Sequence, residues 1–174
     1  MPFLHRNDSP ASISCTLTVL ASADALYEFC QDPTHLAQSV AAAIDINIQD
    51  PSHLHWKIPA KDHGKILLEG DAELVEDVPA KVLTWRGDSA LLEARLEFTP
   101  APGDFGTEVR LSVHLDPGVH AAAKVAKTFS AAPEIAVSKV LRHIKSLVES
   151  GEMPTLAHNP DARKRRHTSE EARL

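Results

Sequence analysis

The sequence is dominated by a long stretch in which apolar and polar residues alternate. The alternation begins near Ile44 and continues for some seventy residues, far more than the ~5–6 residues of one strand. It is interrupted by turn-rich segments such as TPAPGDFG. An earlier alternating segment, Ile13 to Val19, adds one more strand. Consecutive strands with short connections predict an antiparallel meander that has one wet face and one covered face.

The parity of each segment predicts which side chains face inward. The expected inward sets are Ile44, Ile46 and Ile48; Leu54, Trp56 and Ile58; Ile66, Leu68, Gly70, Ala72 and Leu74; Leu83 and Trp85; Leu92, Ala94, Leu96 and Phe98; and Thr107, Val109, Leu111, Val113 and Leu115.

Helical spacing replaces the alternation in two places. Ser22 is a plausible N-cap for a helix that Pro33 ends, and Pro33 opens a second short helix that runs to Val40. Near the C-terminus, helical spacing recurs on both sides of Pro133, which must break or kink the helix. The second part carries an apolar stripe, and Gly151 is a natural residue to end it. The stripe consists of Val137, Val140, Leu141, Ile144, Leu147 and Val148.

The length and composition fit one domain, and the order of predicted strands and helices fits the α+β class. We expect a flexible lead at residues 1–11, a folded domain at 12–155 and a disordered polar tail at 156–174. No apolar run approaches the ~20 residues of a membrane span, and the N-terminus does not read as a secretion signal, so a cytoplasmic location is expected.

Charge is unevenly placed along the chain, whose formal net charge is −6. Residues 161–174 contain five Lys or Arg and three Asp or Glu, so this segment carries +2 and the remaining body −8. An acidic body argues against nucleic-acid binding. The basic run Arg163 to Arg166 suits a solvating tail or a weak contact with an anionic membrane.

Three segments, ELVEDVPAKVLTWRG, LEFTPAPGDFGTEVRLSV and HIKSLVESGEMPT, accompany this order of elements. Together they resemble the SRPBCC superfamily of START-like proteins over roughly residues 12–155. The closest likeness is to its bacterial polyketide cyclase/dehydrase-like or coenzyme Q-binding-like branch. The resemblance implies a helix-grip fold: a curved antiparallel sheet of about seven strands wrapped around a long C-terminal helix, with two short helices after the first strand. It also implies a hydrophobic or amphipathic ligand held between sheet and helix.

The residues give partial support to such a cavity. The C-terminal helical region is rich in alanine, which leaves space opposite the sheet, although close packing of helix on sheet is the simpler alternative. We expect the aromatic walls to be Trp85 and Phe98. The full predicted ligand-binding set is Leu68, Leu83, Trp85, Leu96, Phe98, Val113, Val125, Ala126 and Phe129.

Residues that suggest catalysis or metal binding have simpler interpretations. His53 and His55 share a strand face, but no third ligand is fixed by spacing, so a solvated pair is favoured over a zinc site. The carboxylates Glu69, Asp71 and Glu73 fit the wet side of the sheet.

Tyr27, Arg86 and His143 are the possible polar residues at the pocket, and each suits a structural or surface role. We therefore assign no catalytic residue, no metal and no cofactor.

The favoured function is non-catalytic binding or carrying of a small hydrophobic ligand such as a lipid, isoprenoid or polyketide-like compound. One alternative is a polyketide cyclase or dehydratase, which needs inward polar groups. Another is a protein-interaction module with a closed core.

Overall fold

A computed structural model describes residues 11–41, 44–60, 64–124 and 133–151. Residues 1–10 of the predicted lead and the predicted tail at 156–174 lie outside these ranges, whereas Ala11, the last residue of the predicted lead, belongs to the first strand.

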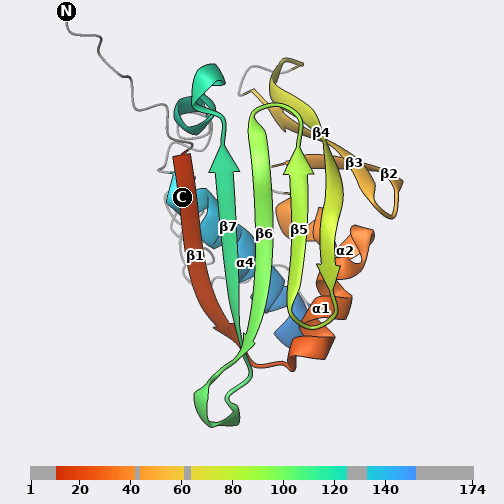
Figure 1. Cartoon of the computed structure of the whole chain (residues 1–174), viewed down its shortest axis with the longest axis vertical. Helices are drawn as coiled ribbons and strands as arrows, with labels where there is room; N and C mark the ends of the chain where they lie inside the picture. The colour runs from red at the N-terminus through yellow and green to blue at the C-terminus, as the bar shows by residue number, and fades with distance from the viewer. Residues whose placement is uncertain (1–10, 42–43, 61–63, 125–132, 152–174) are drawn as a thin grey trace, which may run out of the picture.

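Seven strands form one antiparallel sheet in the spatial order β1-β7-β6-β5-β4-β3-β2 (Figure 1). The six strands after the first form the predicted meander, and β1 joins it by pairing with β7. The pairing of β1 with β7 runs from Ala11 opposite Leu115 to Val19 opposite Thr107. The strands are β1 Ala11–Val19, β2 Asp45–Asp50, β3 His53–Pro59, β4 Ile66–Val78, β5 Val82–Gly87, β6 Leu91–Pro100 and β7 Thr107–Leu115.

The helices lie on one side of this sheet (Figure 1). Helix α1 spans Ala23–Gln31, α2 spans Pro33–Val40 and α4 spans Pro133–Ser150. Residues 121–124 are also helical, and short 3-10 turns occupy Pro102–Asp104 and Pro117–Val119. The arrangement confirms the predicted α+β helix-grip fold with two short helices after the first strand.

The predicted helix ends are confirmed in detail. The Ser22 hydroxyl accepts a hydrogen bond from the Ala25 amide at 3.2 Å, as an N-cap does. Pro33 occupies the first turn of α2, where its missing N–H costs nothing. Gly151 has φ = 71°, and its amide donates to the Leu147 carbonyl, which ends α4 with a left-handed residue.

Helix α4 lies along β1 and is held there at both ends. Near its start, the Cys15 thiol lies 3.5 Å from the Glu134 carbonyl oxygen. Near its end, the Lys145 ammonium donates to the Thr18 carbonyl at 2.8 Å, and the Glu149 carboxylate accepts from the Leu20 amide at 2.8 Å. The hydrogen bond from the Leu20 amide lowers the pKa of Glu149, because it stabilises the charged carboxylate. The contacts fix α4 over one side of the sheet.

The predicted strand parity is wrong in two places. Ile66 was expected to face inward but is 48% exposed, and it lies beside the register shift between Ile58 and Pro59. The sequence placed Leu92 inward, but the β6–β7 register shifts between Leu91 and Glu93. An extra residue at such a bulge exchanges the two faces on one side of it. Leu91, which pairs with Leu115, therefore faces inward together with Ala94.

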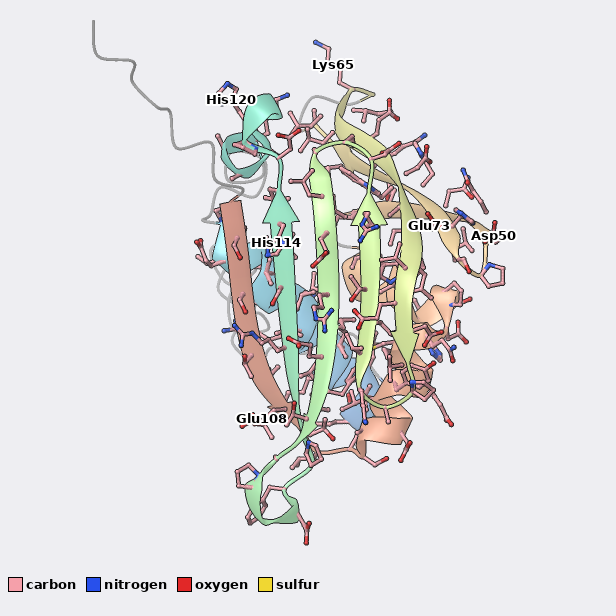
Figure 2. The ribbon with its side chains drawn as sticks, in the orientation of Figure 1. Asp50, Lys65, Glu73, Glu108, His114 and His120 are labelled. Carbon is pink, nitrogen blue, oxygen red and sulfur yellow. The ribbon has the colours of Figure 1, made fainter. Side chains whose placement is uncertain are left out.

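The outer face of the sheet is polar. Figure 2 shows side chains spread over the face turned away from the helices, with Asp50 and Glu73 on the β2 side and Glu108 and His114 at opposite ends of β7. An antiparallel sheet covered on one face shows this division.

Candidate ligand-binding cavity

A cavity of about 200 Å³ lies between the inner face of the sheet and helices α2 and α4. Every described residue that lines it is apolar. The sheet contributes Ile13, Ile46, Leu54, Trp56, Ile58, Leu68, Ala72, Trp85, Leu91, Ala94, Leu96, Leu111, Val113 and Leu115, and the rest comes from Leu36, Val40, Ile44, Ala90, Pro133, Ala136, Val137, Val140 and Ile144.

The cavity exists because the helices pack near the two edge strands of the covered face and leave the middle of that face open. Helix α4 packs mainly on β1, while α2 packs on β2 and on α4. The middle strands therefore face a gap, and small side chains at Ala72, Ala94 and Ala136 leave part of it unfilled. Native interiors contain few voids larger than a water molecule, so a space of this size is a distinctive feature.

The cavity occupies one end of the covered face of the sheet, and helix α1 fills the other end. The ring of Tyr27 packs edge-on against Phe98 with centroids 6.5 Å apart, and Leu26 and Leu83 are almost completely buried. This packing divides the covered face into a filled end and an end that contains the cavity.

The connection between β5 and β6 folds inward over the sheet beside the cavity. This inward fold of the chain is possible because two inward-facing strand positions, Gly70 and Gly87, carry no side chain. A Cβ on Gly70 would meet the Ser89 hydroxyl at 2.2 Å, and a Cβ on Gly87 would meet the Leu91 carbonyl oxygen at 1.9 Å. The turn brings Ala90 to the cavity wall.

The predicted ligand-binding residues fall into three groups. Leu68, Trp85, Leu96 and Val113 line the cavity. Leu83 and Phe98 face the same side of the sheet but lie in the packed core and are not among the lining residues. The other three, Val125, Ala126 and Phe129, lie outside the described residues. Their role in binding stays a prediction.

The sequence analysis did not assign a lining role to β3 or α2. Trp56 and Ile58 are on the inward parity that the alternation predicted, so the signal for them was present. Leu36 and Val40 lie four residues apart on α2, a spacing that puts both on one helix face without indicating what that face covers.

The cavity wall offers no acid or base among the described lining residues. Among the described lining residues, the side-chain nitrogen atoms are those of the two indoles. The Nε1 atoms of Trp56 and Trp85 are buried, and neither has a hydrogen-bond partner within the described structure. The wall therefore presents hydrocarbon surface, which favours apolar contact over proton transfer.

The three polar candidates lie away from this wall. The Tyr27 hydroxyl donates to Asp77, which also accepts from Gln31. The hydrogen bond to Asp77 raises the pKa of Tyr27, because it stabilises the protonated phenol. Arg86 is exposed, and the His143 ring lies 3.1 Å from the Ser39 carbonyl and joins α4 to α2.

The two strand histidines lie on the outer face with carboxylates. His53 Nδ1 is 2.8 Å from Asp50 Oδ2, and His55 Nδ1 is 2.8 Å from Asp71 Oδ1. These hydrogen bonds raise the pKa of each histidine above its ordinary value. Over the described ranges, no group of three His, Cys, Asp or Glu residues is arranged to hold a metal ion.

No family model and no curated protein matches this sequence. Solved structures do match the fold. A protein from Deinococcus radiodurans superposes with a TM-score of 0.62 at 21% identity, over 82% of this chain and 100% of that one. The chain has the helix-grip fold.

Two further structures agree with that assignment. The AHSA1-like protein from Aeromonas hydrophila matches with a TM-score of 0.56 at 16% identity, over 85% of this chain and 100% of its own. The Aha1 dimer from Colwellia psychrerythraea matches with a TM-score of 0.53 at 15% identity, over 82% of this chain and 98% of its own. At these identities the likeness concerns the fold alone. Among the described helices, none is long and apolar enough to cross a membrane.

Proposed function

We propose that the protein binds or carries a small hydrophobic molecule in the cavity between the sheet, α2 and α4, without chemical change to that molecule. The observation that carries the proposal is a cavity of about 200 Å³ whose described lining is wholly apolar. An apolar ligand removes its own surface and the wall from water, which is favourable by ~25 cal/mol per Å². The classes of compound that the resemblance implies, a lipid, isoprenoid or polyketide-like compound, all offer such surface.

A cyclase or dehydratase function has less support. Both reactions move protons and need an acid or base within hydrogen-bond reach of the substrate. The described lining residues carry no titratable group, and Tyr27 is already bonded to Asp77 on the filled end of the sheet. A module with a closed core is also less favoured, because the core encloses a cavity.

Identification of a bound compound tests the proposal. The wild type, purified from its own host, is examined by native mass spectrometry, and the released compound is extracted and identified. We expect an apolar compound at about one per chain. In Ala136→Trp the new indole projects from a residue that lines the cavity, so the compound should be lost.

The matched control is Ile135→Trp, one residue away on α4, where the wild-type side chain is 48% exposed. This variant should retain the compound. Equal retention by both folded variants, or no apolar compound on the wild type, would reject the proposal.

A further inference from the structure

The cavity is small for a lipid, and its volume limits the part of a ligand that it can enclose. A cavity of about 150 Å³ accommodates benzene, which has six carbon atoms. By proportion, about 200 Å³ accommodates roughly eight carbon atoms. A long acyl chain or a multi-ring compound cannot fit completely inside it.

The wall also limits the chemistry of the enclosed part. The described lining has no carboxylate, cation, amide or hydroxyl. The two indole nitrogens are buried within the wall and do not reach the cavity surface. An oxygen atom carried into this space would lose its hydrogen bonds to water without a replacement from the described lining.

Resting on the proposed function, we propose that the ligand class is a medium-length amphiphile: a hydrocarbon portion of about eight carbons fills the cavity, and the polar group stays outside it in water. The hydrocarbon tail enters the cavity and the polar head group stays outside, because the apolar wall suits only the tail. Selection by the site is therefore by tail length.

A series of primary alcohols from butan-1-ol to dodecan-1-ol, titrated calorimetrically, tests the length limit with one constant head group. Each added methylene that enters the cavity should strengthen binding about fourfold, from its transfer free energy. We expect this increase to stop near octan-1-ol, where the cavity is full. Affinity that rises steadily through dodecan-1-ol would overturn the length limit while leaving the proposed function intact.

Two variants should move the limit in opposite directions. Leu91→Ala removes three carbons from the wall, so the limit should move to about eleven carbons. Ala136→Leu adds three carbons to the wall, so the limit should fall to about five. An unchanged limit in both variants, with each shown to be folded, would place the alcohol elsewhere and overturn the inference.

Octane-1,8-diol tests the orientation. It has the tail of octan-1-ol but must bury one hydroxyl group, so it should bind at least tenfold more weakly. Equal affinity would show that a buried indole N–H turns to meet the oxygen, which would overturn the hydrocarbon-only interior. Failure of every alcohol to bind would reject the proposed function together with this inference.

Discussion

At Gly70 and Gly87 even a methyl group has no space. The two positions differ in what blocks them. At Gly70 the nearest atoms belong to the side chains of Ser89 and Asp88, which can rotate away. At Gly87 the nearest atom is the backbone carbonyl of Leu91, which cannot move without displacing β6. The inward fold of the β5–β6 connection beside the cavity therefore depends most on Gly87.

Gly87→Ala should destabilise the protein by about 2–3 kcal/mol, in the range of overpacked interiors. Urea unfolding of the purified variant measures this change. The control is Gly118→Ala, where the nearest atom to a new Cβ is an Asp116 side-chain oxygen at 3.2 Å. The control should change stability by less than about 1 kcal/mol. Similar losses at both positions would contradict the importance of the Leu91 contact.

The histidines of the outer face make the stability of the protein depend on pH. His55 lies between Asp71 and Glu69, with its Nε2 atom 3.4 Å from Glu69 Oε2. The carboxylates stabilise the protonated ring in the folded state, and the hydrogen bond to Asp71 is the main reason that the pKa is raised. This contribution is complete below the unfolded pKa of about 6.5 and is lost as pH rises through the higher folded pKa.

His55→Gln should therefore destabilise the protein more at pH 5.5 than at pH 8.5, as measured by urea unfolding at both values. His114→Gln is a suitable comparison, because His114 Nδ1 lies farther from its carboxylate, 3.9 Å from Glu93 Oε1. The stability that the His114→Gln variant loses should vary less with pH. A His55→Gln loss that is the same at both pH values would contradict the assignment.

At the scale of elements, the sequence predicted the regular strands and the helix ends, but it missed the bulge that interrupts the alternation in β6. The period of two predicted the strands, and Ser22, Pro33 and Gly151 predicted helix ends, because each signal is local. The bulge beside Leu92 was missed, since an unpaired residue has no local signature in an apolar pair such as Leu91–Leu92.

The candidate site was predicted only in part for a related reason. The alternation of inward and outward positions places Trp85 on the covered face of the sheet. It does not show which end of that face a helix fills. The position of α1 places Leu83 and Phe98 in the packed core, and it follows from contacts distant in sequence, such as Tyr27 with Phe98. Likewise, no local pattern shows that α2 completes the cavity.

Helix α4 should be a major source of stability. Leu141 is 2% exposed and faces the core, so Leu141→Ala should cost roughly 2–5 kcal/mol in unfolding free energy. The adjacent Arg142 is exposed, and Arg142→Ala should stay within about 0.5 kcal/mol of wild type. Denaturant titration of both variants measures the contrast. A loss below about 0.5 kcal/mol for Leu141→Ala would show that this face is not packed as described.

For the whole molecule, the main feature is an open sheet whose covered face is filled at one end only. The proposed binding links occupancy to folding, because an unfolded chain has no cavity to offer. Octan-1-ol at 100 times its dissociation constant should raise the unfolding free energy by about 2.7 kcal/mol. Calorimetric melting with and without the alcohol measures this. The gain should be absent in Ala136→Trp, and an equal gain there would point to binding outside the cavity.

The placement of the two indoles has a practical consequence. The chain contains two tryptophans, and both Trp56 and Trp85 line the cavity. All tryptophan emission from the protein therefore originates in the cavity wall, and an entering molecule changes the surroundings of every emitting ring. The protein carries its own optical reporter of occupancy. Trp56→Phe and Trp85→Phe would each leave a single emitter, on β5 or β3 respectively, so that the two sides of the cavity can be observed separately.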